Sequence, residues 1–240
     1  MNGACEPYSE FVYPADRFRG TTVVVDQKSY IDKNLIVIPK QYSPYIDKVV
    51  LSKGSIFDRV EKLAQEIVRD YSDKHVILLV VLKGAVLFGT VLADKITEIL
   101  SNDITNSCSM TFSVEYISVK SYVDDKSTGD VKIKMDEKYL GILKSQNVLI
   151  VEDIYDSGQS LFALTRFLML NVQPSSLKST VLIQKMNTHH LRYDYNIEYL
   201  GFLIPDSFVV GFGMDYNEEF RQLMHLCVIN QVGIEKFKNK

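Results

Sequence analysis

Apolar residues follow two patterns along the chain, one typical of amphipathic helices and one typical of fully covered strands. Between residues 55 and 71 they recur on one face at about 3.6-residue spacing, which predicts a helix. Ser55, followed three residues later by Asp58, resembles a capping box and is expected to begin that helix. Residues 76–82 are apolar at every position, and residues 147–151 at every position after Asn147, as in strands of a parallel sheet covered on both faces.

The remaining predicted elements alternate between helices and strands. Helices are expected at 85–100 and 161–170, and strands at 110–119, 180–183, 198–203 and 208–212. The polar, glycine-containing segment 122–130 is expected to form a long loop. The repeated order of strand, turn, helix and strand predicts an α/β fold, with a mainly parallel twisted sheet flanked by helices.

No internal repeat, low-complexity tract or linker interrupts the chain, so we expect a single domain over residues 1–240. The core of this domain is expected at about 51–185. Segments of about 35–50 and 186–240 are expected to form a smaller flanking lobe, and residues 1–34 a loosely attached arm.

Composition narrows the classes of protein that the chain can represent. It holds 27 Lys and Arg against 30 Asp and Glu, and this net charge of −3 argues against binding nucleic acid through overall charge. Cys5, Cys108 and Cys227 are far apart and odd in number, so neither a disulfide framework nor a zinc site is indicated. The N-terminal segment lacks an apolar signal core, and the run 76–82 is far shorter than the ~20 residues of a membrane-spanning helix. We therefore expect a cytoplasmic protein with no membrane association.

The candidate chemistry lies in the sequence EDIYDSGQS, which follows the second all-apolar strand. Ser157, Gly158 and Ser160 stand where a helix is expected to begin, an arrangement that suits a phosphate because backbone N–H groups are unpaired there. Glu152 and Asp153 would repel a phosphate, but they can hold sugar hydroxyls or a divalent cation. The segment therefore predicts a sugar phosphate site. The alternative is a solvated turn whose polar residues only cap the helix.

The segment VLIVEDIYDSGQS resembles the 5-phosphoribosyl-1-pyrophosphate (PRPP) binding motif of the type I phosphoribosyltransferases. Within that group the chain resembles the hypoxanthine-guanine phosphoribosyltransferase family, whose motifs occur here in the same order: VLKGAVLF at 81–88, SYVDDKSTGD at 121–130, PDSFVVGFGMDYNEEFR at 205–221 and HLCVI at 225–229. The resemblance runs from about residue 35 to residue 232 and implies the type I phosphoribosyltransferase fold with a hood lobe. It also implies Mg²⁺-dependent purine salvage, in which PRPP and hypoxanthine or guanine give IMP or GMP and pyrophosphate.

The resemblance assigns roles to residues around the ribosyl donor. Asp156 matches the general base beside N7 of the purine, and it also belongs to the PRPP-binding segment. Glu152 and Asp153 match the pair on the ribose hydroxyls and Mg²⁺, and Asp215 is a further carboxylate on the metal side. The residues that match the 5′-phosphate loop are Ser157, Gly158, Gln159 and Ser160.

Other roles concern the leaving group and the purine. Lys83 and Gly84 match the pyrophosphate loop, with a non-proline cis peptide before the lysine, and Arg221 matches a pyrophosphate-binding arginine. Ser121 and Tyr122 begin a segment that resembles the flexible lid. The residues that match purine contacts are Lys185 at the 6-oxo group, Phe208 stacked on the base, and Val209 and Asp215 through their backbones.

Without the resemblance, these residues have plainer explanations. Asp156 would cap a helix, Lys83 would extend along the surface, and Phe208 and Val209 would pack in the core, while the lid would be a surface loop. Adjacent His189 and His190 lack a third ligand and are expected in a solvated loop.

The phosphate loop departs from the family pattern, because Ser157 and Ser160 replace the usual threonines and Gln159 a frequent lysine. We expect weaker PRPP binding at worst, with a catalytically weak nucleotide-binding homologue in a regulatory or assembly role as the alternative. A pyrimidine or adenine transferase fits Lys185 poorly. The resemblance also implies a homodimer or homotetramer.

Overall fold

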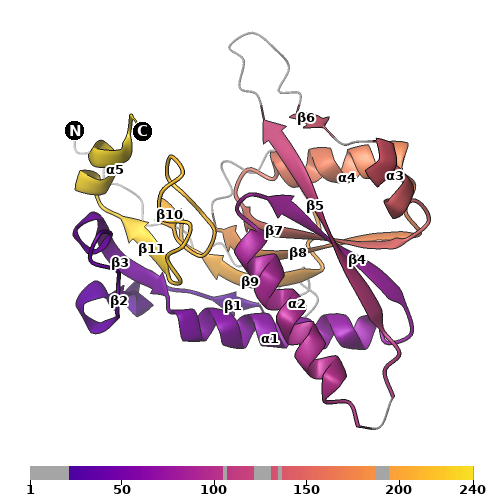
Figure 1. The fold of residues 1–240 in the computed structure, drawn as a ribbon. Helices are drawn as coiled ribbons and strands as arrows, with labels where there is room; N and C mark the ends of the chain where they lie inside the picture. The colour runs from indigo at the N-terminus through magenta and orange to yellow at the C-terminus, as the bar shows by residue number, and fades with distance from the viewer. Residues whose placement is uncertain (1–21, 105–106, 122–130, 135–136, 187–194, 240) are drawn as a thin grey trace, which may run out of the picture.

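The computed structural model describes residues 22–104, 107–121, 131–134, 137–186 and 195–239, and its centre is a seven-stranded sheet (Figure 1). The strands of this sheet are β1 (Val23–Val24), β4 (His75–Leu82), β5 (Thr111–Ser121), β6 (Val131–Lys134), β7 (Asn147–Tyr155), β8 (Ser176–Lys185) and β9 (Tyr199–Ile204). They lie in the order β1-β9-β8-β7-β4-β5-β6. Only the β5–β6 pair is antiparallel, so the predicted α/β fold with a mainly parallel sheet is confirmed.

Helices cover the sheet on both sides (Figure 1). They are α1 (Lys53–Asp70), α2 (Val86–Ser101), α3 (Glu137–Leu143) and α4 (Gln159–Asn171). The connection β4–α2–β5 moves along the strand order toward β6, whereas the connection β7–α4–β8 moves toward β1. Because parallel crossovers are right-handed, α2 and α4 lie on opposite faces.

The first predicted helix forms, but it begins earlier than expected. Its N-cap is Ser52, whose side chain accepts a hydrogen bond from the backbone N–H of Ser55 at 3.1 Å. Ser55 therefore lies in the first turn, and the prediction that it caps the helix is wrong. The predicted apolar face is buried, and it also includes Arg59 and Glu66.

Two strands extend beyond their predicted ends. β7 continues to Tyr155, which is paired with Gln184 of β8. Glu152 and Asp153 consequently lie within the last residues of a buried strand, not after its end as the sequence analysis expected. β8 in turn runs to Lys185, which places this lysine at the end of the sheet.

A second sheet with its own apolar cluster forms a smaller lobe. Its strands are β2 (Ile31–Asp32), β3 (Ile46–Leu51), β10 (Val209–Val210) and β11 (Leu226–Ile229), all antiparallel, in the order β10-β11-β3-β2. Helix α5 (Gln231–Phe237) lies beside it (Figure 1). The described residues also form three single-turn 3₁₀ helices, at Gln27–Ser29, Lys33–Leu35 and Ser43–Tyr45.

Residues 22–34 and β9 do not lie where the predicted domain boundaries place them. β1 pairs with β9 and β2 with β3, and Val25 is buried in the main core. The expected loose arm is therefore wrong for residues 22–34, while residues 1–21 lie outside the described part of the chain. β9 was expected in the hood lobe, but it belongs to the main sheet because it pairs with β8.

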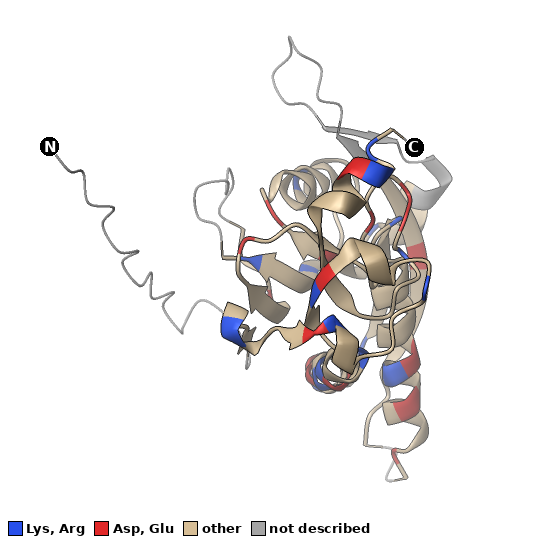
Figure 2. Ribbon diagram, turned by 90° about the vertical axis from the view of Figure 1, so that its left-hand side faces the viewer, with Lys and Arg blue, Asp and Glu red and all other residues tan. Residues whose placement is uncertain are grey.

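Two further observations bear on the classes of protein considered above. Lys and Arg positions are interspersed with Asp and Glu positions along the described part of the ribbon (Figure 2). None of the described helices is long and apolar enough to cross a membrane. The predicted lid residue Tyr122 and the pair His189 and His190 lie outside the described residues.

Candidate active site

The predicted site residues come together because β4, β7 and β8 are parallel neighbours that end at one edge of the main sheet. The segment after β4 begins with Lys83, and the segment after β7 begins with Asp156. Lys185 is the last residue of β8. Three segments far apart in the sequence are therefore adjacent in space, as expected of a site at the carboxyl ends of parallel strands.

The phosphate loop forms at the start of α4. Gly158 is the residue before the helix and has a φ of +77°, a backbone conformation that other residues adopt only with strain. A Cβ atom there would also overlap the phenol of Tyr155, so glycine is required twice over. A cavity of about 160 Å³ is bounded by the loop, with the lining residues Glu152, Ile154, Tyr155, Asp156, Ser157, Gly158, Gln159, Ser160 and Leu161.

Glu152 and Asp153 form a buried pair of carboxyl groups, each about 8% exposed. The backbone N–H of Asp153 donates to Glu152 Oε1 at 3.2 Å, and that of Ile154 donates to Asp153 Oδ1 at 3.0 Å. Burial raises the pKa of both groups, and the adjacent Asp153 carboxylate raises the pKa of Glu152 further. Two buried, mutually repelling carboxyl groups fit a divalent cation with oxygen ligands, which would compensate their charge.

Asp156, the predicted base, and Lys185, the predicted purine contact, form an ion pair. Lys185 Nζ lies 3.2 Å from Asp156 Oδ2 and 3.6 Å from Asp206 Oδ1. The lysine side chain is only 12% exposed, whereas both carboxylates are about half exposed. The arrangement offers a hydrogen-bond donor and an acceptor side by side at the edge of the sheet.

Phe208 lies in the segment before β10, two residues after Asp206, and is 48% exposed, so it is not a core residue. Its ring meets the ring of Tyr216 edge to face, with centroids 5.4 Å apart. Val209 is buried in β10. Tyr216 was missed by the sequence analysis, since nothing in its local pattern indicates contact with Phe208.

The loop after β4 packs against both sheets. The peptide bond between Leu82 and Lys83 is cis, as the family resemblance implied. A Cβ atom at Gly84 would overlap the carboxyl group of Asp153. A Cβ atom at Gly213, which has a φ of +96°, would overlap the carbonyl oxygen of Gly84. Glycine at both positions therefore permits the loop, β7 and the segment after β10 to meet.

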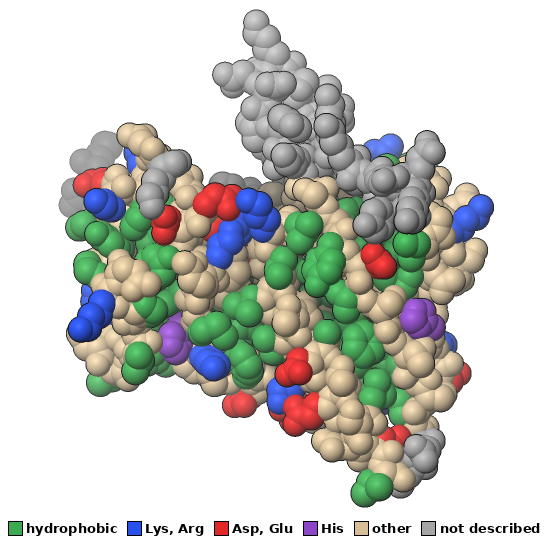
Figure 3. Space-filling view, viewed as in Figure 1, with side chains coloured by type: hydrophobic (Ala, Val, Ile, Leu, Met, Phe, Trp, Pro, Cys, Tyr) green, Lys and Arg blue, Asp and Glu red, His purple; other side chains and the backbone are tan. Residues whose placement is uncertain are grey.

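Arg221 and Lys83 share a carboxylate partner that the sequence analysis missed. Glu218 lies 3.0 Å from Lys83 Nζ and 3.4 Å from the Arg221 guanidinium, and both cations lower the pKa of this carboxyl group. Arg221 also pairs with Asp215 at 2.9 Å and donates to the carbonyl oxygen of Gly213 at 2.9 Å. Figure 3 shows acidic and basic side chains next to each other beside the N-terminal end of α2.

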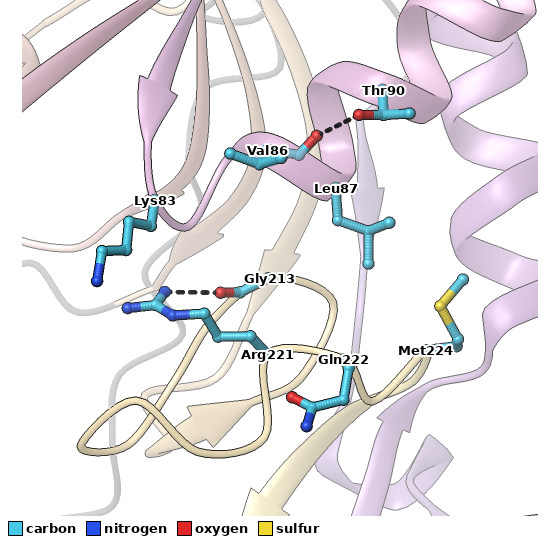
Figure 4. A pocket seen from close by; sticks show the side chains of 8 residues that line it. All are labelled: Lys83, Val86, Leu87, Thr90, Gly213, Arg221, Gln222 and Met224. Carbon is cyan, nitrogen blue, oxygen red and sulfur yellow. Dashed lines mark hydrogen bonds between the residues drawn. The ribbon is translucent and has the colours of Figure 1, made fainter.

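A cavity of about 480 Å³ adjoins these cations. In Figure 4 the Lys83 ammonium and the Arg221 guanidinium lie on the same side, away from the apolar Leu87 and Met224. The eight lining residues are Lys83, Val86, Leu87, Thr90, Gly213, Arg221, Gln222 and Met224.

The three residues predicted to bind Mg²⁺, Glu152, Asp153 and Asp215, do not form one cluster. In the described part of the chain no group of three or more His, Cys, Asp or Glu side chains is placed to hold a metal ion. Glu152 and Asp153 are adjacent, whereas Asp215 is paired with Arg221. Ser121 ends β5, and its partner in the predicted lid lies outside the described residues.

Comparison with known proteins identifies the family of the chain. The family described as "Phosphoribosyl transferase domain" matches residues 48–217. Hypoxanthine-guanine phosphoribosyltransferase of Bos taurus is 38% identical over 218 residues, which are 91% of this chain and 97% of that protein. The Homo sapiens enzyme is 38% identical over 224 residues, which are 93% of this chain and 99% of that protein.

A solved structure is similar as well. Hypoxanthine-guanine phosphoribosyltransferase from Schistosoma mansoni in complex with IMP has a TM-score of 0.74 and 29% sequence identity. The match covers 91% of this chain and 100% of that one. The predicted type I phosphoribosyltransferase fold and the predicted enzyme class are thereby confirmed. The chain belongs to the hypoxanthine-guanine phosphoribosyltransferase family.

Proposed function

We propose that this enzyme transfers the 5-phosphoribosyl group of PRPP to N9 of hypoxanthine or guanine, with Asp156 as general base. The observation that carries the proposal is the pair formed by Lys185 and Asp156 at 3.2 Å, at the ends of neighbouring strands. A 6-oxopurine presents its O6 acceptor next to N7–H, and the lysine donates while the carboxylate accepts. Adenine would place its 6-amino donor against the lysine, which disfavours it.

The other site residues would hold the two ends of PRPP. The 5′-phosphate fits the cavity at the start of α4, where backbone N–H groups and two serine hydroxyls converge. The ribose hydroxyls lie at Glu152 and Asp153. The pyrophosphate lies at Lys83 and Arg221, whose cationic ends face the same side. Phe208 offers its exposed ring to the purine.

This arrangement stabilises the charges that develop in the reaction. As the bond between N9 and the anomeric carbon forms, the bond to pyrophosphate breaks and its electrons leave with the pyrophosphate. The purine proton passes from N7 to the Asp156 carboxylate, and Lys185 holds O6 meanwhile. Lys83 and Arg221 stabilise the negative charge that develops on the leaving pyrophosphate.

Magnesium is proposed as the cofactor. Glu152 and Asp153 would hold it together with water and substrate oxygens, and Asp215, which is paired with Arg221, is the third carboxylate that the family resemblance assigns to it. When bound, it supplies positive charge beside the ribose and the pyrophosphate.

The decisive experiment is steady-state kinetics of Asp156→Asn, with Asp206→Asn as the matched control, because both carboxylates contact Lys185 and are similarly exposed. We expect the Asp156 variant to lose about 10²- to 10⁴-fold in kcat on hypoxanthine, with little change in PRPP affinity. The control should keep most of its rate. Turnover of the Asp156 variant near that of the wild type would show that the base is another group.

A catalytically weak nucleotide-binding homologue is the second candidate, favoured by the serines and Gln159 of the phosphate loop. Product assays with PRPP, Mg²⁺ and each 6-oxopurine between about pH 6 and 9 separate the two functions. Tight GMP binding without any product would favour the second. We also propose a cytoplasmic homodimer or homotetramer, which light scattering and cell fractionation test.

A further inference from the structure

Glu218 bridges the two cations that are proposed to bind pyrophosphate. Its Oε2 lies 3.0 Å from Lys83 Nζ, and its Oε1 lies 3.4 Å from the Arg221 guanidinium. Each carboxylate oxygen thus faces one cation. Glu218 and Lys83 are 135 residues apart in the sequence, so only the fold brings them together.

The backbone holds Glu218 in this position. Asn217 and Glu218 both have positive φ values, +50° and +67°, which non-glycine residues adopt rarely. The backbone N–H of Glu218 donates to Asp215 Oδ2 at 2.8 Å, and the side-chain amide of Asn217 donates to the carbonyl oxygen of Phe237 at 2.7 Å. The turn is therefore fixed at several points, and it directs the glutamate at the cations.

The charges in this group cancel. Lys83 and Arg221 carry two positive charges, and Glu218 and Asp215 carry two negative charges. An incoming pyrophosphate consequently meets a neutral group and must compete with Glu218 for both cations. The Glu218 side chain is 64% exposed, so it can leave without opening the core.

We propose that Glu218 is an internal counter-ion of the pyrophosphate site. Its carboxylate pairs with Lys83 and Arg221 until pyrophosphate binds, and pyrophosphate then displaces it from both cations. It lowers the affinity for free pyrophosphate and thereby favours release of the product. Pyrophosphate can replace both contacts at once because it has two charged ends, whereas orthophosphate replaces them poorly. The inference depends on the proposed role of Lys83 and Arg221.

Isothermal titration of pyrophosphate into the full-length enzyme tests this, with and without Mg²⁺. Glu218→Gln should bind pyrophosphate about threefold to tenfold more tightly, as expected when two partly exposed ion pairs are removed. Its gain for orthophosphate should be smaller. Glu219→Gln is the matched control, because Glu219 is the next residue and its carboxylate accepts a hydrogen bond from the Tyr42 hydroxyl at 3.4 Å. The control should bind as the wild type does.

Arg221→Gln separates the two ways in which the inference can fail. If this variant binds pyrophosphate more weakly while Glu218→Gln binds no more tightly, the pyrophosphate site stands and the counter-ion role is overturned. If Arg221→Gln binds pyrophosphate as the wild type does, the proposed leaving-group site is wrong, and the role of Glu218 falls with it. Thermal unfolding of each variant verifies that it is folded.

Discussion

Replacing Glu152 by glutamine should stabilise the metal-free, ligand-free protein even though it damages the substrate site. Glu152 and Asp153 are each about 8% exposed, and burial raises the pKa of both. The charge of Arg221 lowers the pKa of Asp153 but does not offset burial. Glutamine has the shape of glutamate, and its Nε2 can donate to the Asp153 carboxylate as a protonated glutamate would. The variant therefore removes a buried charge without opening a cavity.

The size of the effect follows from the cost of burying a second carboxylate beside the first. Relief of that cost is worth about 1–2 kcal/mol, since the partial compensation by backbone N–H groups is retained in the variant. In a chain of 240 residues each kcal/mol moves the melting temperature by about 2–4 °C. We expect an increase of about 2–8 °C for Glu152→Gln at pH 8.

The gain must depend on pH in a definite direction. Because the pKa of Glu152 is higher in the folded than in the unfolded protein, the folded state holds its proton more tightly. The wild type therefore loses stability as the pH rises from the ordinary value of 4.5 through the raised value in the fold. Glutamine does not titrate, so its advantage is largest at pH 8 and shrinks as the pH is lowered toward 5.

Thermal and urea unfolding in EDTA at these two pH values is the assay, with Glu66→Gln as a control for a buried glutamate outside the site. The same preparations should show a much higher KM for PRPP with Glu152→Gln. A lower melting temperature at pH 8, or an equal gain at both pH values, would refute the idea that the paired carboxyl groups destabilise the empty site.

Three further substitutions test other parts of the structure. Gly158→Ala forces a Cβ atom into the Tyr155 ring at a φ of +77°. It should destabilise the fold by about 1–3 kcal/mol and raise the KM for PRPP, and an unchanged melting temperature would contradict this. Lys185→Met removes the donor beside Asp156, and kcat/KM for hypoxanthine should fall about 10²- to 10³-fold with little loss of PRPP affinity; comparable loss of both would indicate a merely structural lysine. Arg59→Met leaves two buried carbonyl groups of β9 without their donor and should cost about 2–4 kcal/mol in urea unfolding, whereas a neutral result would mean that the strand edge is hydrated.

The sequence predicts the elements of the main sheet because their burial is nearly uniform. β4 is apolar at every position after His75, β7 is apolar at 148–151, and the amphipathic face of α1 is unambiguous. The end of β7 could not be predicted from composition, since Glu152 and Asp153 resemble turn residues. Pairing with β8 continues past them to Tyr155, so contact with the partner strand overrides the local preference for a turn.

The second sheet was less accessible to sequence reasoning. β10 is two residues long, and β3 pairs with β11 from the far end of the chain. The family resemblance supplied roles for Lys83 and Arg221, but not the carboxylate between them. Glu218 is an exposed residue in a turn with no apolar pattern around it. Its proposed role depends on its contact with Lys83, which is 135 residues away in the sequence.

The balance of charge at the site explains why a divalent cation is expected there. Six carboxyl groups and three cationic side chains gather at the site, and all nine lie at the ends of the strands or in the loops beyond them: Glu152, Asp153, Asp156, Asp206, Asp215, Glu218, Lys83, Lys185 and Arg221. PRPP and pyrophosphate are themselves strongly anionic, so they would enter a region that already carries excess negative charge. Each cationic side chain is moreover paired with a carboxylate before substrate arrives. Binding therefore requires added positive charge at the buried pair and displacement of carboxylates at the exposed cations. The first is the role proposed for Mg²⁺ at Glu152 and Asp153, and the second is the role proposed for movement of Glu218.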